Sequence, residues 1–382
     1  MRILAIDLTY ASFGGADTQI TQIMKNIDVY DFDRYIIYMN NENAELFEVN
    51  SNNVSLINVR YTSKSLLIRI LWQQIILPFR LIYDDATVLF SPGNISPIFS
   101  FINTAQWIGT IGPFERDFYR HFPLKNKILL FFNKLLMQFS SLTSEHVFFE
   151  SNYTLNLFVK KYKFSREKGS VINIGSGEMF FPVDKYYELK VSPFVNKKFI
   201  LTVSHLYPYK NIEVLLEAFS QYSHDDEETY LVIAGSTPFK KYFDKISALS
   251  ESLGISDRVI FLGKMNQSEL RELYSLCTLF VFTSPYENFA YTLVEAMSCG
   301  APIISTNTTA MPETCESAAI YFDPFSVSDL IDKIIKLMSN ENLRLKYKEL
   351  SIKQSRNIND YREVNIKTNA ALCGIIPNRN DA

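Results

Sequence analysis

The sequence predicts an α/β protein with two domains, each a doubly wound parallel sheet. Short β-branched runs alternate with segments that have apolar residues at helical spacing, a pattern typical of parallel sheets covered on both faces. The chain has 382 residues, enough for about two domains. Its 47% hydrophobic and 21% charged residues are those of an ordinary globular protein.

The alternation is clearest in the second half of the chain. Five short apolar runs there are predicted strands: 199–204, 230–234, 259–262, 279–283 and 303–305. The segments between them have helical spacing: 212–222, 242–253, 269–277 and 292–298. Asn266 and Glu269 form a predicted capping box, and Gly254 and Gly300 lie where helices commonly end.

The first half begins in the same way, with a predicted strand at 3–8, a loop with Gly14 and Gly15, and a helix from about residue 17. Further strands are predicted at 35–39, 54–59, 87–89 and 146–149. We expect a first domain over 1–190, a second domain over 191–360, and a tail over 361–382 that can pack back on the first domain. Ligands of doubly wound sheets bind at the carboxyl ends of the strands, so we expect the site in a cleft between the domains.

Charge, cysteine content and the N-terminus disfavour several classes of protein. The formal net charge is −3 and no dense Lys/Arg block occurs, which argues against nucleic-acid binding. The four cysteines are far apart, which disfavours a zinc site or a disulfide scaffold and favours a reduced, cytoplasmic protein. We expect no signal peptide, and no uninterrupted apolar run reaches the ~18 residues of a spanning helix.

The chemically most informative segment is 284–302, which follows a strand of Leu, Phe and Val. Glu287 lies in the loop after that strand, and Glu295 lies about one turn inside the next helix. The start of a helix offers N–H groups and a positive dipole to a phosphate. Two carboxylates can accept hydrogen bonds from the hydroxyls of a ribose and a sugar. From spacing alone, the alternative is a solvated pair on a surface helix.

This segment resembles the signature of retaining glycosyltransferases of family 4, which have the two-domain GT-B fold. The family pattern is Glu-Gly-Phe-Gly followed by Glu-Ala-Met-Ala-Cys-Gly-x-Pro. Here the chain reads Glu287-Asn-Phe-Ala and then Glu295-Ala-Met-Ser-Cys-Gly-Ala-Pro. Asn288 and Ala290 replace the two loop glycines, and Asn accepts a left-handed backbone more readily than Ala does.

The run Val203-Ser-His-Leu-Tyr-Pro-Tyr-Lys-Asn is similar to the family's Val-Gly-Arg-Leu-x-x-x-Lys-Gly. Lys210 matches the family's Lys, and His205 stands at the position of its Arg; in the family both neutralise the donor diphosphate. An imidazole with a pKa of about 6.5 carries only part of an arginine's charge. The alternatives are an exposed lysine and a packed histidine without a ligand. The segments 261–265 and 312–324 are also similar to the family.

The resemblance implies that the domain 1–190 binds the acceptor and that the domain 191–360 binds the nucleotide-sugar donor. It also implies Glu287 and Lys210 as catalytic residues. The implied donor contacts are Glu295, His205, Asn288, Phe289, Ala290, Tyr291, Thr292, Leu293, Gly263, Lys264, Met265, Gly14 and Gly15. Many relatives have a histidine in the loop that here reads Trp107 to Arg116, at the position of Gly109 or Thr110, and this chain lacks it. Thr110, Glu115 and His121 are the candidates to replace it on the acceptor side.

The implied reaction transfers a sugar, with retention, from a nucleoside diphosphate sugar to a glycan or lipid-linked acceptor, in bacterial surface polysaccharide or lipopolysaccharide O-antigen biosynthesis. We expect no metal and no other cofactor. Asp31-Phe-Asp33 has the form of a GT-A metal motif, but it precedes a strand and predicts a turn. The alternatives are a nucleotide-sugar epimerase of the same architecture and a silent sugar-nucleotide-binding scaffold. A dinucleotide-dependent oxidoreductase is disfavoured, because no Gly-x-Gly-x-x-Gly follows the first strand.

Two stretches, 66–83 and 124–139, are rich in Leu, Ile and Phe and carry scattered basic residues: Arg69, Arg80, Lys125, Lys127 and Lys134. Stretches of this kind can lie on an anionic membrane, where a lipid-linked glycan would be found. The alternative is two core helices with a solvated edge. We therefore expect a cytoplasmic protein that can make peripheral contact with the inner face of the membrane.

Overall fold

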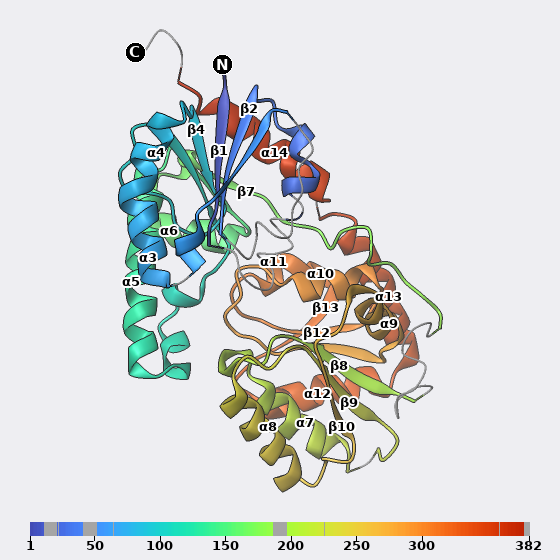
Figure 1. Ribbon diagram of the computed structural model, residues 1–382. Helices are drawn as coiled ribbons and strands as arrows, with labels where there is room; N and C mark the ends of the chain where they lie inside the picture. The colour runs from blue at the N-terminus through green and yellow to red at the C-terminus, as the bar shows by residue number, and fades with distance from the viewer. Residues whose placement is uncertain are drawn as a thin grey trace. The chain divides into compact units, whose positions relative to one another are not determined.

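A computed structural model describes residues 1–10, 21, 23–40, 52–63, 65–185, 197–224, 226–358 and 360–377. The chain divides into two compact units, shown in Figure 1. Unit 1 comprises Met1–Asn173 and Tyr361–Ala382, and unit 2 comprises Ile174–Asp360. Each unit is described by itself below.

Unit 1 contains a seven-stranded parallel sheet with the strand order β3-β2-β1-β4-β5-β6-β7. The strands are β1 (Ile3–Leu8), β2 (Arg34–Met39), β3 (Val54–Asn58), β4 (Val88–Ser91), β5 (Asn103–Ile108), β6 (His146–Phe149) and β7 (Gly169–Val171). The strand order reverses beside β1, where β2 pairs on one side and β4 on the other. Crevices at such a switch point are where doubly wound sheets bind ligands.

Helices cover both faces of this sheet (Figure 1). The longer elements are α3 (Leu66–Leu71), η3 (Trp72–Ile76), α4 (Leu77–Tyr83), α5 (Leu124–Thr143), α6 (Asn152–Tyr162) and α14 (Tyr361–Gly374). Short 3-10 turns are η1 (Ile27–Val29), η2 (Arg60–Ser63), η4 (Gly112–Phe114), η5 (Asp117–His121) and η6 (Arg166–Lys168). The last helix, α14, is fixed to the first strands by a buried 2.5 Å hydrogen bond from the Tyr30 hydroxyl to Asn365 Oδ1.

The segment η3 is a π-helical turn within the continuous helix 66–83. The turn lets two consecutive side chains reach the same loop: Gln73 Nε2 donates to the carbonyl of Ile95 at 2.9 Å and Gln74 Nε2 to that of Ser96 at 3.1 Å. Gln73 Nε2 also donates to the buried carboxyl of Asp7 at 2.7 Å. Turns of this type are frequent at functional sites, and this one connects β1 to the loop after β4.

Unit 2 contains a six-stranded parallel sheet with the order β10-β9-β8-β11-β12-β13. The strands are β8 (Phe199–Val203), β9 (Tyr230–Ala234), β10 (Val259–Gly263), β11 (Leu279–Phe282), β12 (Ile303–Thr306) and β13 (Ala319–Phe322). The helices are η7 (Pro208–Lys210), α7 (Ile212–Tyr222), α8 (Lys240–Ser252), α9 (Gln267–Leu276), α10 (Tyr291–Ser298), α11 (Met311–Cys315), η8 (Glu316–Ala318), α12 (Val327–Met338) and α13 (Glu341–Ser355). Strand residues and α7, α8 and α12 share one apolar core.

The predicted elements of unit 2 agree with the structure to within two residues at each end. The capping box of Asn266 and Glu269 is confirmed, with both reciprocal hydrogen bonds present. Gly254 and Gly300 have φ of +70° and +75°, so the predicted helix ends are confirmed as well. Three strands were not predicted: β5, β7 and β13.

The division between the units lies at Asn173 and Ile174, ahead of the predicted boundary at 190 and 191. The described residues after 173 are held by unit 2. Val183 N donates to Ser275 Oγ at 3.1 Å, and the Arg271 guanidinium lies 4.5 Å from the centroid of the Phe181 ring. These contacts to α9 place the linking segment in the second unit, although its prolines mark a joint in the sequence.

Among the described residues, one helix, Leu66–Tyr83, is long and apolar enough by composition to cross a membrane. Its inner side carries Trp72, Leu77 and Leu81, which are buried in the core of unit 1 beside the sheet. It is therefore a surface helix of unit 1. The four cysteines are free thiols, and Cys277, Cys299 and Cys315 are buried.

Candidate functional site

A half-buried ion pair connects two loops at the carboxyl ends of neighbouring strands in unit 2. Lys210, in η7 after β8, places Nζ 2.5 Å from Oε1 of Glu287, which lies in the loop after β11. Ser284 Oγ donates to the same carboxylate oxygen at 2.8 Å. Thr283 Oγ1 donates to the carbonyl of Lys210 at 2.7 Å. The structure thus brings together the two residues expected to be catalytic.

Lys210 remains a cation in this site. Burial alone lowers the pKa of its ammonium, but the Glu287 carboxylate outweighs that effect, so the net pKa is raised above its ordinary value. The ammonium also lies 5.1 Å from the centroid of the Tyr209 ring, which itself stacks on Tyr207. A desolvated ammonium held between a carboxylate and an aromatic face is well placed to meet an anionic ligand.

His205 lies beside the pair but contributes no full charge. Although His205 is exposed on one side, partial desolvation by its neighbours and the positive charges of Lys210 and Lys264 lower the pKa of its imidazole below the ordinary 6.5. The ring is therefore neutral near pH 7, and its Nδ1 lies 2.5 Å from Ser236 Oγ in a hydrogen bond. It follows that His205 acts here through a hydrogen bond, whereas an arginine would act through charge.

Ser236 and Gly235, which follow β9, form part of this site and were not predicted. Gly235 has φ of +140°, and a Cβ on it would lie 1.8 Å from the carbonyl oxygen of Ser204. Only glycine therefore permits the loop after β8 to approach the end of β9 so closely. The sequence signal was the Ala-Gly-Ser run directly after a buried strand, which is typical of close backbone approach.

The loop before α10 adopts its shape without glycine. Ala290, the N-cap, has φ of −107°, and Asn288 is not among the residues with positive φ. Asn288 is buried, as are Phe289 and Ala290. The two glycine replacements therefore demand no left-handed backbone here, which differs from the expectation at Asn288.

No side chain caps the N-terminus of α10. The backbone N–H groups of 289–293, which were predicted to bind an anion, differ in whether they are used within the helix. Leu293 is fully buried and its N–H donates to Ala290 O at 3.0 Å, so that group is used within the first turn. Tyr291 and Thr292 occupy the first two helical positions, whose N–H groups point out of the helix end. Phe289 packs edge-to-face against Tyr291, with ring centroids 5.5 Å apart.

The side chain of Glu295, a residue of α10, accepts a hydrogen bond of 2.9 Å from the hydroxyl of Tyr274. Burial raises the pKa of its carboxyl to about 7, although the Tyr274 hydrogen bond opposes the rise. The carboxyl therefore changes charge near neutral pH. It is neither part of a solvated surface pair nor ion-paired in the way that Glu287 is.

The remaining predicted donor contacts follow β10. Gly263 has φ of +71° and its carbonyl accepts a 2.7 Å hydrogen bond from Gly235 N, so the ends of β9 and β10 are tied together. Lys264 is exposed and Met265 is half-buried. Gly14 and Gly15 lie outside the described residues.

The acceptor-side candidates belong to unit 1. Thr110 is half-buried after β5; Glu115 Oε1 accepts a 3.2 Å hydrogen bond from the Tyr153 hydroxyl; and His121 is half-buried in η5. A residue not predicted for this role, Glu150, lies beside the position of the missing histidine. Its Oε1 accepts from Trp107 Nε1 at 3.2 Å and lies 3.3 Å from the position of a Cβ built on Gly109.

The Asp31 and Asp33 carboxylates have structural partners in unit 1. The Arg2 guanidinium contacts Asp31 at 2.9 and 3.0 Å, and Arg2 N donates to Asp33 Oδ2 at 2.6 Å. The motif lies in an irregular segment with a bend at Asp33, directly before β2, and not in the hydrogen-bonded turn that was predicted. Within the described residues, no three His, Cys, Asp or Glu side chains come together as a metal site would require.

Comparison with known proteins gives a matching family for the second half of the chain. Residues 188–354 match the glycosyl transferases group 1 family. The serotype-specific mannosyltransferase WbdA of Escherichia coli is 32% identical over 192 residues, which cover 48% of this chain and 24% of WbdA. The match thus spans about a quarter of the length of this curated relative.

Two solved structures have the same fold as the whole chain. Sucrose-phosphate synthase from Thermosynechococcus elongatus aligns with a TM-score of 0.78 at 15% identity, covering 97% of this chain and 98% of that one. HepE from Anabaena, in complex with UDP, aligns with a TM-score of 0.72 at 18% identity, covering 98% and 100%. The predicted fold class, GT-B with two doubly wound units, is confirmed by these similarities and by the two parallel sheets. Residues 188–354 match the glycosyl transferases group 1 family, in the part of the chain where the sequence resemblance lies.

Proposed function

We propose that the protein is a retaining glycosyltransferase that moves a sugar from a nucleoside diphosphate sugar to an acceptor hydroxyl. The observation that supports this best is the Lys210–Glu287 pair at the carboxyl ends of β8 and β11, within a glycosyl transferases group 1 match. The Lys210 ammonium would meet the donor diphosphate, and the Glu287 carboxylate would accept hydrogen bonds from the transferred sugar. Glu295 would accept hydrogen bonds from the ribose.

In the proposed reaction, the bond between the anomeric carbon and the diphosphate oxygen breaks, and negative charge develops on the leaving phosphate. Lys210 and the uncapped N-terminus of α10 would stabilise that charge as fixed, preorganised groups. The acceptor oxygen bonds to the anomeric carbon on the face that the phosphate leaves, and the leaving phosphate takes the acceptor proton. We propose that these groups suffice without a metal ion.

For the donor, we propose a nucleoside diphosphate hexose. Mannose is the first candidate sugar, because WbdA is a mannosyltransferase, and UDP is a candidate nucleotide because HepE binds it. For the acceptor, we propose a glycan or lipid-linked glycan of bacterial surface polysaccharide or O-antigen synthesis, which WbdA's serotype-specific role favours. The proposed location is cytoplasmic, at the inner face of the membrane.

The test is a donor screen of the purified full chain with EDTA present. GDP-mannose, UDP-glucose and UDP-galactose are each assayed by thermal shift and by proton NMR, which reads the anomeric configuration of the released sugar. We expect one donor to stabilise the protein and to release its sugar slowly, first as the anomer that the donor carried. An epimerised nucleotide sugar as product would instead establish an epimerase. Binding without any release, even with glycan acceptors, would establish a silent scaffold.

A further inference from the structure

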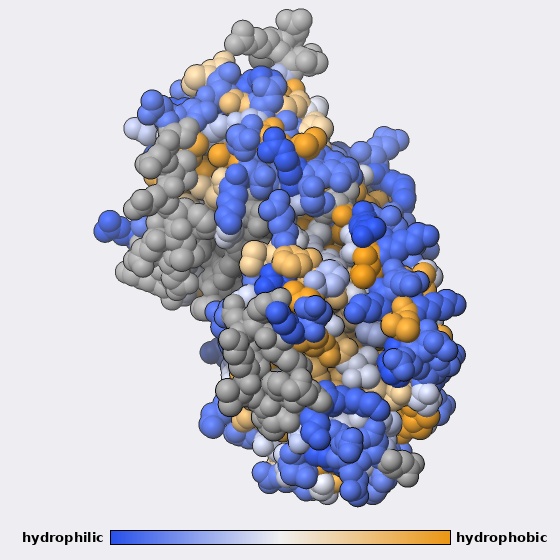
Figure 2. Space-filling view, turned by 90° about the vertical axis from the view of Figure 1, so that its right-hand side faces the viewer, coloured by the Kyte–Doolittle hydropathy of each residue, from blue (hydrophilic) through white to orange (hydrophobic). Residues whose placement is uncertain are grey.

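Unit 1 carries a concentration of exposed apolar side chains. Of the 26 large hydrophobic residues that are exposed in the described chain, 17 lie in three segments: the helix 66–83, the loop residues Phe99 and Phe101, and α5. By contrast, hydrophilic residues dominate the face in Figure 2, and hydrophobic ones there form only small groups. A large exposed apolar patch marks an interaction surface.

The helix 66–83 contributes a straight apolar ridge. Its members are spaced by four residues and are 47% to 78% exposed: Leu67, Leu71, Ile75, Phe79 and Tyr83. In an α-helix, a step of four residues turns about 40° beyond a full turn, so such a row would wind around the helix. The wider π-turn at 72–76 counters that drift and keeps the row on the outer side, opposite the buried Trp72, Leu77 and Leu81.

The first half of α5 contributes a second apolar surface. Leu124, Ile128, Phe131 and Phe132 are each at least half exposed. The buried residues of this 20-residue helix, Met137, Ser140 and Ser141, all lie in its second half. No residue in the first half of α5 is fully buried within unit 1, and several there are half-buried.

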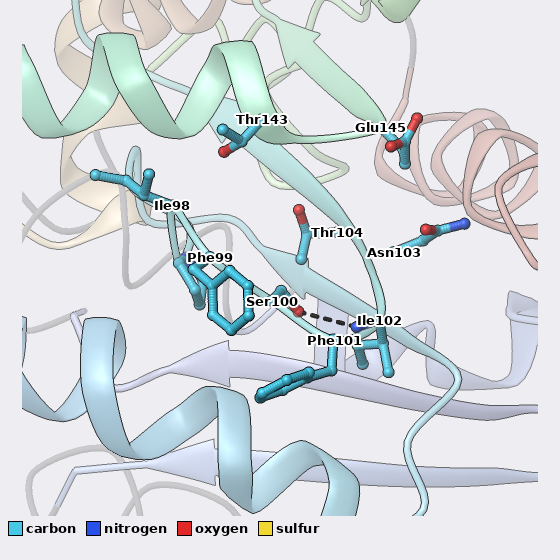
Figure 3. A pocket seen from close by; sticks show the side chains of 10 residues that line it. Ile98, Phe99, Ser100, Phe101, Ile102, Asn103, Thr104, Thr143 and Glu145 are labelled. Carbon is cyan, nitrogen blue, oxygen red and sulfur yellow. Dashed lines mark hydrogen bonds between the residues drawn. The ribbon is translucent and has the colours of Figure 1, made fainter.

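The loop 97–102 lies between the helix 66–83 and the C-terminal end of α5. The Phe101 ring lies 5.5 Å from Phe79 of α4 and 4.8 Å from Phe99, measured between centroids. The same loop lines a pocket of about 180 Å³ together with Thr143, the last residue of α5, and Glu145. Figure 3 shows this loop running between the two helices. We call these three segments together the apolar face of unit 1.

Basic residues outnumber acidic ones in the same part of the chain. Residues 66–145, which span the three segments and the pocket, contain seven Lys and Arg and five Asp and Glu, although the whole chain has a net charge of −3. Four of these cations have partners inside unit 1: Arg69 donates to Tyr10 O, Arg80 pairs with Asp84, Arg120 pairs with Asp117, and Lys134 lies 5.7 Å from the Tyr162 ring centroid. The sequence-based interpretation of Arg69, Arg80 and Lys134 as membrane contacts is therefore not supported.

Lys125 and Lys127 are different. They lie in the first turn of α5, a helix end with no acidic residue and no side-chain cap. Two cations at the positive end of a helix dipole destabilise the helix. Natural proteins typically retain such unfavourable local charges at functional sites. An anionic partner beside this turn would remove the conflict.

We propose that the apolar face of unit 1 docks on an anionic lipid bilayer, with the apolar side chains at the acyl boundary and Lys125 and Lys127 on lipid phosphates. The proposal deepens the proposed function, since it places the enzyme where a lipid-linked acceptor lies. A second copy of the chain is the less favourable occupant, because a symmetric dimer through this face would bring two net-positive surfaces together. Partial insertion of apolar side chains, assisted by basic residues, is how peripheral proteins bind such membranes.

The test is co-sedimentation of the full chain with phosphatidylcholine vesicles, with and without 30% phosphatidylglycerol, in the absence of nucleotide sugar. We expect binding to the anionic vesicles that weakens as salt rises from about 0.1 to 0.5 M. Phe131→Ser with Phe132→Ser should weaken vesicle binding by roughly tenfold or more. Lys125→Glu with Lys127→Glu should weaken it by at least about 25-fold, at roughly fivefold per lysine.

Matched controls lie in unit 2. Phe325→Ser with Leu345→Ser removes two exposed apolar residues, and Lys241→Glu with Lys346→Glu reverses two exposed lysines; both should leave vesicle binding unchanged. Glutamates at 125 and 127 also interact favourably with the dipole of α5. Reduced vesicle binding by the Lys125→Glu, Lys127→Glu variant therefore cannot be attributed to unfolding of this helix. Equal binding by all variants would overturn the proposal. So would a dimer, detected by sedimentation velocity, that the Phe131 and Phe132 substitutions dissociate. Donor hydrolysis without vesicles, which these variants should retain, reports on the proposed function separately.

Discussion

The Tyr274 hydroxyl donates a 2.9 Å hydrogen bond to Glu295 Oε2, and this carboxyl binds its proton with a pKa of about 7. The cause of the raised pKa is burial, which disfavours the charged form. Between pH 4.5 and 7, the folded protein therefore holds a proton that the unfolded chain has released. Two pH-dependent consequences can be measured.

The first consequence concerns stability. Because the folded state binds the additional proton, the contribution of Glu295 to stability is present at pH 5 and is lost as pH rises through about 7, by roughly 3 kcal/mol in total. Glu295→Gln, which is neutral at every pH, should be stabilised relative to wild type at pH 8 but much less at pH 5. Urea unfolding at both pH values measures this. Glu251→Gln, on the exposed surface of α8, is the control; if the Glu295 and Glu251 variants behave alike, the assignment is wrong.

The second consequence concerns donor binding. A carboxylate accepts hydrogen bonds from two ribose hydroxyls better than a protonated carboxyl does. The apparent Kd for the donor should therefore fall as pH rises from 6 to 8, and this change should be absent in Glu295→Gln. Isothermal titration with the donor identified in the screen is the measurement. A pH dependence that persists in the variant would mean that another group titrates.

Lys210 and His205 should differ sharply in their contribution to catalysis. Lys210→Met removes the cation that would face the diphosphate and should lower kcat by about 10²–10³-fold. His205→Ala removes only a neutral hydrogen-bonding ring and should cost less than about tenfold. His205→Arg restores the charge found in relatives and should tighten donor binding. Steady-state kinetics of the three variants tests the order, and equal losses for Lys210→Met and His205→Ala would contradict it.

Gly235 should tolerate no side chain. A Cβ there would lie 1.8 Å from Ser204 O, and φ is +140°, so Gly235→Ala should destabilise unit 2 by roughly 3 kcal/mol or more. Gly254→Ala is the matched control, because its φ is also positive at +70° but no atom lies within 4 Å of the added Cβ. That variant should cost only about 1 kcal/mol. Chemical denaturation measures the free energy of unfolding of both variants. Similar losses of stability would show that the contact with Ser204 O does not cause the destabilisation.

Ala290 should not need to be restored to the glycine of relatives. Its φ of −107° is ordinary for alanine, so Ala290→Gly should add chain entropy to the unfolded state and destabilise the protein by about 0.5–1 kcal/mol. Turnover should remain within about twofold of wild type. A large gain in turnover would instead mean that the alanine has impaired the loop, as the scaffold alternative requires.

Local sequence signals sufficed for features that depend on local geometry. The capping box of Asn266 and Glu269, the helix end at Gly300 and the strand at 279–282 each depend on neighbours within a few residues, and each was predicted. The strand β5 was missed because Gln106 interrupts its apolar run. In the fold, that amide is buried and donates to the carbonyl of Asn94, a partner twelve residues away.

The candidate site was predictable where its chemistry follows the family pattern and not where it depends on packing. Lys210 and Glu287 were identified from the sequence, but their ion pair joins residues 77 positions apart. The neutral state of His205 depends on Lys264 and on burial, which no local pattern reveals. Ser236 and Glu150 became candidates only through contacts with other strand ends.

The return of the final helix to the first sheet has a consequence for synthesis on the ribosome. Unit 2 is continuous in sequence, so it can complete its core once Asp360 has left the exit tunnel. Unit 1, although its first strands are translated earlier, lacks α14 until residues 361–374 emerge, and Tyr30 stays without Asn365 until then. The N-terminal half must therefore wait in an unfinished form while the second half folds, exposed to chaperones and proteases for longest. A stop codon between residues 361 and 374 would therefore damage unit 1 and leave unit 2 complete.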